Sequence, residues 1–357
     1  MPVEPGTHVQ GYVKAGLPSA DASGPVAAVH HGGDLSEANR LFPDAPKPWI
    51  DLSTGISPYP YPLPPFDSEV WTRLPEGSEI DSLRQAAASA YGAEPAQIVP
   101  ATGTQPLMAA LAASVPPAEA AILSPTYQEH ARLCMQAGHG VLPFGEWDNL
   151  SDAARLVIVV NPNNPTGSLT SRERLLQVAD EMERRGGLLV VDEAFMDSVA
   201  GAAQFSLAET VEGRRIAVLR SFGKFYGLAG LRLGFAVAGE ALANRLTSRL
   251  GPWPVSGPAI AVGREALANV HWQNEQRRRL AKAQERLDAL LAKSAYRPAG
   301  ESPLFRTIHD GRADALFQRL GQNGIWVRRF EQDPNMLRLG LPASEIAWER
   351  LAESLRR

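Results

Sequence analysis

Short apolar segments that alternate with helical patterns constrain the fold of this chain more than any other feature. Residues 156–160 and 188–191 are apolar throughout, which is typical of strands buried on both faces. Between them, capping-box spacing at 170–173 and the pair Gly186-Gly187 indicate the two ends of a helix. We therefore predict an α/β fold whose large domain is a mostly parallel sheet flanked by helices. Its other expected strands are 120–123 and 216–219, and its other expected helices are 81–91 and 105–114.

The pattern changes beyond about residue 240, where we expect a second, smaller α+β domain. Residues 257–293 form a long, charged helical stretch. It is followed by shorter segments: strands 304–308, 325–328 and 336–339, and helices at 313–322 and from about Ser344. The N-terminal residues are rich in Gly, Pro, Ala and His with little periodicity, which predicts an extended arm. The expected organisation is an arm at 1–48, a large domain at 49–240 and a small C-terminal domain at 241–357.

Composition argues against several classes of function. The chain of 357 residues has a net charge of -4, so no basic surplus indicates a nucleic acid or an anionic membrane as partner. No apolar run approaches the roughly 20 residues of a membrane span, and the N-terminus lacks a charged-then-apolar secretory pattern, so we expect a cytoplasmic location. The single cysteine, Cys134, lies in a helical pattern and is expected to be a buried thiol. It cannot form a cysteine cluster, and we predict no metal site.

Polar residues follow several of the predicted strands, at the edge where open α/β sheets bind ligands. Asn164 belongs to the proline-rich turn 161–167, and Asp192 ends the next strand. A carboxylate at a buried strand end is costly unless it has a charged or hydrogen-bonding partner. The neighbouring Glu193 points to the other face of the strand, so Asp192 is the preferred site residue. Each feature also has a simpler interpretation. The turn that contains Asn164 is compatible with a proline-stiffened turn that binds nothing, and Asp192 is compatible with a cap for the turn that follows its strand.

A further set of residues suits a phosphate and an aromatic ring. The turn Thr102-Gly103-Thr104 precedes a helix, whose first N–H groups are free to bind an anion. Farther on, Lys224 lies between Ser221 and Arg232 in a glycine-rich segment. Tyr127 follows another short strand and offers a ring for stacking. Taken singly, each of these is also compatible with an ordinary turn, a solvated charge or packing.

In chain order, these features are a glycine turn, an aromatic residue, an asparagine, an aspartate, and a lysine followed by an arginine. This order resembles the fold-type I enzymes that use pyridoxal 5'-phosphate (PLP), the aspartate aminotransferase superfamily, and most closely its histidinol-phosphate aminotransferase branch. The resemblance implies that Lys224 holds the cofactor aldehyde, with Asp192 at the pyridinium nitrogen and Asn164 at the phenolic oxygen. Lys224 and Asp192 are the implied catalytic residues. The implied cofactor-binding residues are Thr102, Gly103, Thr104, Tyr127, Asn164, Asp192, Ser221, Lys224 and Arg232.

The N-terminal part bears on the reaction. Residues 29–34 and 50–58 resemble, in their spacing, the opening of the L-threonine-O-3-phosphate decarboxylases of cobalamin biosynthesis. The positions that depart from that pattern are Leu52, Thr54, Gly55 and Ser57. The implied substrate is a small amino acid with a carboxylate and a phosphate, both of which suit arginine. The implied substrate-binding residues are His31, Gly55, Ile56, Arg328 and Arg338, with Arg329 as the alternative to Arg328.

The cofactor motifs are common to decarboxylases and aminotransferases, so an aminotransferase resembling histidinol-phosphate aminotransferase is the alternative reading of the reaction. A non-enzymatic regulator is less consistent with the sequence, since the first 50 residues carry no helix-turn-helix or basic pattern. An NAD-dependent enzyme is also less consistent, because no G-x-G-x-x-G follows an early strand.

Two departures from the family pattern concern Phe195 and Leu74. Many relatives carry a tyrosine at both positions. At the first it bonds the phenolic oxygen of the cofactor, and at the second it reaches the cofactor phosphate of the neighbouring subunit. We expect a homodimer all the same, because sites of this superfamily form at the subunit interface.

Overall fold

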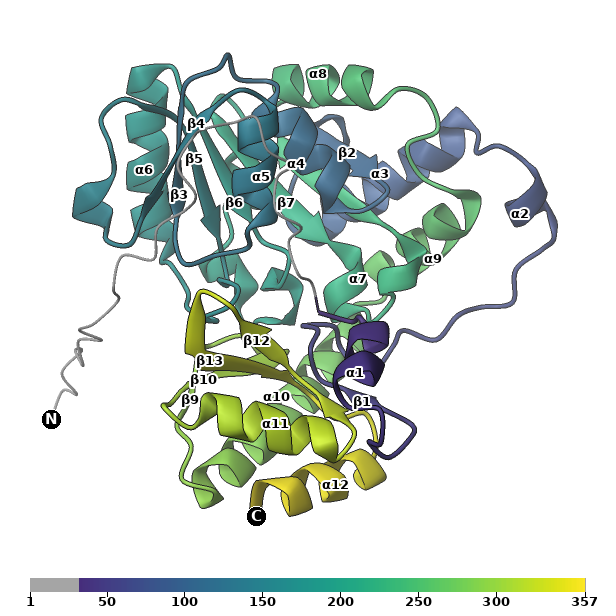
Figure 1. Ribbon diagram of the computed structural model, residues 1–357. Helices are drawn as coiled ribbons and strands as arrows, with labels where there is room; N and C mark the ends of the chain where they lie inside the picture. The colour runs from purple at the N-terminus through teal and green to yellow at the C-terminus, as the bar shows by residue number, and fades with distance from the viewer. Residues whose placement is uncertain (1–31, 357) are drawn as a thin grey trace, which may run out of the picture.

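The computed structural model describes residues 32–356, and its centre is a seven-stranded sheet (Figure 1). The strand order across the sheet is β2 (Ile98–Ala101), β8 (Gly234–Ala238), β7 (Ile216–Ser221), β6 (Leu188–Asp192), β5 (Ala154–Val160), β3 (Glu119–Leu123) and β4 (Gly140–Phe144). Strand β8 runs antiparallel to both of its neighbours, and all other neighbours in this sheet pair in parallel. The predicted α/β fold with a mostly parallel sheet is therefore confirmed.

Alternate residues of the central strands enter two separate cores, which is why these strands have no polar face. In β5, Val157 and Val159 belong to one core, and Leu156 and Ile158 to the other. Helices that contribute to the first core include α3 (Gly77–Tyr91), α6 (Arg172–Arg185) and α9 (Gly257–Ala268). Those of the second are α4 (Thr104–Ala112), α5 (Glu129–Gln136) and α8 (Glu240–Leu250). Burial on both faces requires the continuous apolar sequence found in these strands.

A four-stranded antiparallel sheet forms the smaller C-terminal domain, which lies below the large sheet in Figure 1. Its strand order is β12 (Arg328–Phe330), β13 (Asp333–Gly340), β10 (Phe305–His309) and β9 (Pro298–Ala299). The helices beside it are α10 (Val270–Lys293), α11 (Ala313–Gln322) and α12 (Glu345–Arg356). A parallel pair of short strands, β1 (Ile50–Asp51) and β11 (Ile325–Trp326), joins the segment that precedes the large sheet to this domain.

Three elements differ from the expectation. The helical stretch 257–293 is two helices, because Asn269 leaves helical geometry and its side-chain oxygen accepts from the Trp272 N–H at 3.0 Å, which caps α10. The expected strand 325–328 is divided between β11 and β12, which pair with different strands. The arm contains a short helix, α1 (Leu35–Leu41), in place of extended chain.

Helices α8 and α9 continue the layers around the large sheet beyond residue 240. Helix α8 packs on α4 and β2, and α9 packs on α3. The domain boundary placed at residue 240 stays a prediction. At the start of α6 the capping residue is Ser171 rather than Thr170, since the Ser171 hydroxyl accepts from the Arg174 N–H at 3.2 Å.

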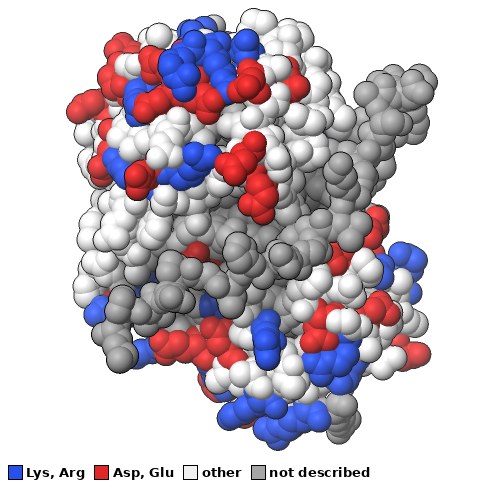
Figure 2. Space-filling view, turned by 90° about the vertical axis from the view of Figure 1, so that its left-hand side faces the viewer, with Lys and Arg blue, Asp and Glu red and all other residues white. Residues whose placement is uncertain are grey.

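Three expectations from composition concern the cysteine, the surface charge and membrane spans. Cys134 is buried in α5, and burial raises the pKa of its thiol to about 12. On the face shown in Figure 2, basic and acidic side chains are intermixed rather than separated by sign. No helix of residues 32–356 is long and apolar enough to cross a membrane.

Candidate active site

The carboxyl ends of β5, β6 and β7 lie side by side, and the loops after them carry predicted cofactor residues. The parallel register pairs Val160 of β5 with Asp192 of β6, and Asp192 with Leu219 of β7. Asn164 follows β5, and Lys224 lies on the short helix α7 (Phe222–Phe225) that follows β7. Because parallel strands end at one edge, residues far apart in the sequence are brought together there.

Lys224 is held in a partly buried position at this edge. Its backbone carbonyl accepts a hydrogen bond from the Ser57 N–H at 2.9 Å, which connects α7 to the segment after β1. Its side-chain nitrogen lies 5.8 Å from the centroid of the Phe195 ring. Burial and the positive charge of Arg338 lower the pKa of the Lys224 amine to about 8, although Asp192 acts in the opposite direction. More of this amine is therefore uncharged near neutral pH than in an exposed lysine.

Asp192 is buried and uses both carboxylate oxygens. His130 Nε2, on α5, lies 2.9 Å from Oδ2, and the Ala194 N–H donates to Oδ1 at 3.0 Å. His130 was not predicted from the sequence, because a single histidine in a helical pattern carries no signal of its own. Only the core that α5 and β6 have in common places it at Asp192.

Tyr127 lies next to His130. The two rings meet edge to face, with their centroids 6.0 Å apart. Burial, and to a lesser extent the carboxylates of Glu129 and Asp192, raise the pKa of the Tyr127 hydroxyl to about 12. An uncharged ring at this place keeps its faces available for stacking.

The turn before α4, the end of β7 and Arg232 meet on one side of the site. Gly103 has a φ of 87°, and a Cβ there would lie 2.8 Å from Nη2 of Arg232, so the position requires glycine. Gly234 packs on the same turn, and it pairs with Ser221 across the ladder between β7 and β8. Hydroxyl, guanidinium and the N–H groups of the first turn of α4 form a donor set that suits a phosphate.

Arg338, on β13 of the small domain, reaches the same edge of the large sheet. Its guanidinium donates to the side-chain oxygen of Asn164 and, at 2.7 Å, to the carbonyl of Ser53. It also lies over the Phe305 ring, 5.0 Å from the centroid. Its Nε is buried without a hydrogen-bond partner among the described residues, and burial together with Arg328 lowers the pKa of the group to about 9. A buried cation with an unused donor is a candidate partner for an anion.

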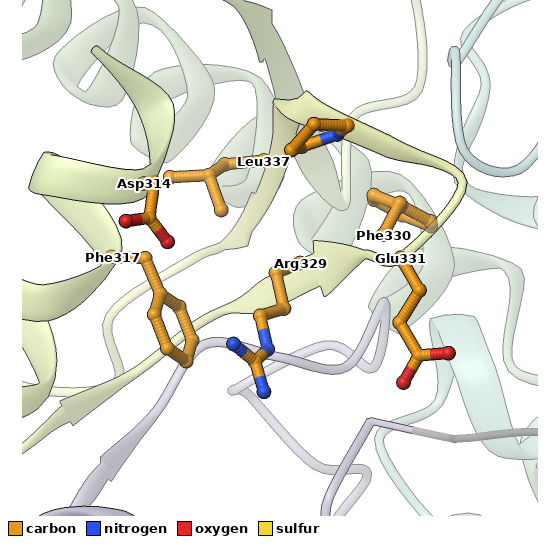
Figure 3. A pocket seen from close by; sticks show the side chains of 7 residues that line it. Asp314, Phe317, Arg329, Phe330, Glu331 and Leu337 are labelled. Carbon is orange, nitrogen blue, oxygen red and sulfur yellow. The ribbon is translucent and has the colours of Figure 1, made fainter.

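Arg328 lies on the same face of the small sheet as Arg338, and Arg329 lies on the opposite face. Arg328 is directly opposite Arg338 in the antiparallel pair of β12 and β13. The Arg329 guanidinium instead lies over the Phe317 ring, 4.8 Å from the centroid, beside a pocket of about 240 Å³ (Figure 3). This pocket is lined by Asp314, Phe317, Arg329, Phe330, Glu331, Pro334 and Leu337. Of the two arginines that the sequence left open, Arg328 is the one beside Arg338.

Gly55 and Ile56 lie on the segment between β1 and the large domain. A Cβ on Gly55 would lie 2.8 Å from Cε1 of Phe195 and 3.2 Å from Cδ1 of Phe305, so this close packing requires glycine. Ile56 is partly buried and directly precedes Ser57, the residue whose N–H bonds the Lys224 carbonyl. Gly55 therefore packs closely against the rings of Phe195 and Phe305, and Ile56 lies next to the residue that connects this segment to α7.

The described end of the arm reaches the same place. Gly33 donates its N–H to the Ser53 hydroxyl at 2.7 Å, and the Ser53 carbonyl is the group that Arg338 bonds. His31, predicted to bind substrate, lies outside the described residues. No group of three or more His, Cys, Asp or Glu side chains within residues 32–356 is arranged to hold a metal ion.

Comparison with known proteins identifies the family. The family model for aminotransferase class I and II matches residues 65–355, which is most of the chain. The chain belongs to this family. It is 45% identical over 329 residues to a threonine-phosphate decarboxylase of Pseudomonas aeruginosa, covering 92% of this chain and 97% of that protein. It is 40% identical over 336 residues to a threonine-phosphate decarboxylase of a Sinorhizobium species, covering 93% and 98%.

One solved structure has a similar fold. Histidinol-phosphate aminotransferase from Sinorhizobium meliloti, in complex with pyridoxal-5'-phosphate, has a TM-score of 0.76 and 21% identity, covering 98% of this chain and 99% of that one. The predicted superfamily and fold type are therefore confirmed for this aminotransferase-family chain.

Proposed function

We propose that this protein removes CO2 from L-threonine O-3-phosphate with PLP as its cofactor, giving (R)-1-aminopropan-2-yl phosphate. The observation that carries the proposal is the similarity, over nearly the full length, to two threonine-phosphate decarboxylases at 45% and 40% identity. The site adds a chemical reason. The substrate carries a carboxylate and a phosphate, and Arg328 and Arg338 lie on one face of the small domain. The sequence resemblance connects the product with cobalamin biosynthesis.

The residues present fit PLP. The turn at Gly103 admits no side chain against Arg232, as a close phosphate cradle requires. A buried carboxylate stands at the strand end, and the Lys224 amine makes no hydrogen bond or ion pair with any residue in the described range. We assign the phosphate to Thr102, Gly103, Thr104, Ser221 and Arg232, the ring to Tyr127, Asn164 and Asp192, and the aldehyde carbon to Lys224. Bound PLP supplies a protonated ring that takes up the electron pair left when a bond to the substrate α-carbon breaks.

Each group of the chain has its own task in this proposal. Asp192, fixed by His130, holds a negative charge that favours a protonated ring nitrogen. Lys224, with a pKa of about 8, takes up or gives a proton at Nζ near neutral pH, which suits delivery of a proton to the α-carbon after CO2 leaves. Arg338 and Arg328 bind the anionic groups of the substrate and so fix its orientation.

The test is release of CO2 by the purified, PLP-loaded protein from L-threonine O-3-phosphate, without any keto acid. The expected result is one CO2 and one amine phosphate for each substrate consumed, measured with carboxyl-labelled substrate and by mass spectrometry. A PLP-loaded protein that releases no CO2 contradicts the proposal.

An aminotransferase acting on histidinol phosphate is the second candidate. The observation in its favour is the full-length likeness to histidinol-phosphate aminotransferase from Sinorhizobium meliloti, which at 21% identity bears on the fold alone. The distinguishing assay supplies histidinol phosphate with 2-oxoglutarate. Formation of glutamate, with no CO2 from the phosphorylated threonine, would favour this candidate over the decarboxylase.

We also propose that two copies of the chain form a homodimer. Leu63, Trp71 and Leu74 are 59%, 68% and 64% exposed, on the segment around α2 (Glu69–Thr72) that projects from the molecule in Figure 1. Trp253 is also exposed, on the loop before α9, and α9 contacts α2. Exposed apolar groups gathered in this way are typical of a surface that another chain covers. Light scattering after size exclusion should give twice the chain mass, and Trp71→Asp should shift it toward the monomer. The cytoplasmic location stays a prediction.

A further inference from the structure

A buried ionic cluster lies directly behind the strands that carry the cofactor residues. The chain passes from Asp192 to Glu193 at the end of β6, and from Arg220 to Ser221 at the end of β7. Because neighbouring residues of a strand point to opposite faces, Asp192 and Ser221 lie on the cofactor side, and Glu193 and Arg220 lie behind it. Glu193 and Arg220 are only 0% and 5% exposed.

The Arg220 guanidinium lies between three acceptors. Its Nε is 3.1 Å from Oε2 of Glu193, its Nη1 donates to Oδ1 of Asp197 at 2.5 Å, and its Nη2 donates to the Ser206 hydroxyl at 3.0 Å. Ser206 in turn donates to Oε2 of Glu193 at 2.7 Å, and the Leu207 N–H donates to Oε1 at 2.9 Å. The cluster therefore joins the end of β6, the end of β7 and the loop that follows β6.

The same cluster connects to the backbone of Lys224. The Asp197 carbonyl accepts from Nε of Arg277, on α10, at 2.9 Å. The preceding residue, Gln276, donates to the Ser57 hydroxyl at 2.7 Å, and the Ser57 N–H bonds the Lys224 carbonyl. A path of polar contacts and one peptide link thus runs from behind Asp192, through α10, to the helix that carries Lys224.

Charge makes Arg220 the essential member of this cluster. It is one cation between two buried carboxylates, those of Glu193 and Asp197. A buried carboxylate left without a cation is strongly unfavourable, so loss of Arg220 would force the chain around both acids to rearrange or the acids to take up protons. Either change alters the strand end next to Asp192.

We propose that Arg220 is a positioning residue of the cofactor site. By balancing Glu193 and Asp197, it fixes the ends of β6 and β7 and so sets the relative placement of Asp192 and Lys224. The inference rests on the assignment of PLP to this site. It does not rest on decarboxylation as the reaction, since any chemistry of the bound cofactor needs the same placement.

The experiment measures the dissociation constant of PLP for the cofactor-free, full-length protein, at a temperature where every variant is folded by circular dichroism. Arg220→Lys keeps the charge but loses the fork of donors, and it should weaken PLP binding by about tenfold or more, as substitutions of outer partners do at metal sites. Ser206→Ala removes one uncharged member of the cluster. It should weaken PLP binding by about fivefold, the equivalent of one hydrogen bond of ~1 kcal/mol. Ser206→Ala also serves as the second variant if Arg220→Lys does not fold.

Arg185→Lys is the matched control. Arg185 likewise has three partners: it donates to the Ser151 carbonyl at 2.7 Å and to Oδ1 of Asp152 at 2.8 Å, and it pairs with Glu181. It lies at the end of α6, near the amino ends of the strands and away from the site. Its substitution should lower the thermal stability of the cofactor-free protein and leave the PLP dissociation constant unchanged.

The outcomes separate the two proposals. Unchanged PLP binding in both Arg220→Lys and Ser206→Ala would overturn the positioning role, and so would equal weakening in Arg185→Lys. If the parent protein binds PLP but releases no CO2, the proposed reaction fails while the PLP titrations still test Arg220.

Discussion

Arg328 and Arg338 lie directly opposite each other on the antiparallel strands β12 and β13. Like charges placed across a strand pair repel each other, and Arg328 accordingly contributes, after burial, to the lowered pKa of Arg338. An anion bound between the two guanidinium groups offsets this repulsion and stabilises both charges. This favours a substrate with more than one negative group, as phosphorylated threonine has.

Replacing either arginine by methionine should therefore weaken substrate binding, and this effect should be larger than the effect on the stability of the folded protein. For Arg338→Met and Arg328→Met we expect KM for L-threonine O-3-phosphate to rise about 10- to 100-fold, since a charge-assisted hydrogen bond contributes about 1.5–3 kcal/mol. Steady-state CO2 release measures the change. Arg329→Met is the control, because its side chain lies on the other face of β12 (Figure 3), and its KM should stay close to that of the parent. Equal damage from Arg328→Met and Arg329→Met would mean that the face assignment is wrong.

Gly103→Ala should impair the phosphate cradle. The new Cβ would lie 2.8 Å from Nη2 of Arg232, and the backbone has φ 87° and ψ -179°, a region essentially restricted to glycine. We expect PLP affinity to fall by at least about tenfold, the equivalent of roughly 1.4 kcal/mol. Gly186→Ala is the comparison, because Gly186 also has a positive φ, of 67°, but has no atom within 4 Å of the added Cβ. It should cost about 1 kcal/mol of stability and leave PLP affinity unchanged.

His130 should matter to the cofactor through Asp192. His130→Ala leaves Oδ2 of a buried carboxylate without its partner at 2.9 Å, which costs about 1–3 kcal/mol, so the rate of CO2 release should fall about 5- to 100-fold. His130→Gln retains a donor and should recover part of the loss. His139 is also buried, but its partners are backbone groups, including the Ala112 carbonyl at 2.8 Å. His139→Ala should therefore destabilise the fold but leave the rate of CO2 release per folded molecule unchanged. Equal loss of this rate in His130→Ala and His139→Ala would contradict the role of His130 at Asp192.

The sequence predicted the central sheet because its residues obey a local rule. A strand buried on both faces must be apolar at every position, and β5 and β6 satisfy this rule without reference to any other segment. The same rule placed Asn164 and Asp192, since a polar residue directly after such a strand lies at the ligand edge. Fold class and the order of the candidate site residues could be predicted for this reason.

Features that depend on contacts between distant segments could not be predicted. His130 meets Asp192 only because α5 and β6 contribute to the same core on one face of the sheet. The choice between Arg328 and Arg329 depends on where β12 begins to pair with β13, and the expected strand 325–328 combined two strands whose partners differ. Periodicity within one segment contains no information on the partner strand, so pairing and register remained open.

The pKa of Lys224 gives a final prediction for the cofactor-free protein. The amine has a pKa of about 8 in the folded state against an ordinary value of 10.5, mainly because burial disfavours its charge. Between these pH values the unfolded chain binds more protons than the folded one, so the free energy of unfolding contributed by Lys224 rises with pH across this window. Below pH 8 the group destabilises the folded state, by on the order of 1–3 kcal/mol after allowance for partial exposure.

Lys224→Met removes this contribution. In urea denaturation without PLP, the variant should be more stable than the parent at pH 7, and the difference should shrink as the pH is raised toward 10.5, because the parent amine then loses its charge in both states. Groups that titrate in this range without contact with Lys224 are common to the two proteins and cancel in the difference, whereas the repulsion between Lys224 and Arg338 is part of the difference that is measured. A difference in stability that stays constant from pH 7 to 10 would contradict the lowered pKa of Lys224 and, with it, the role of this amine as a proton carrier near neutral pH.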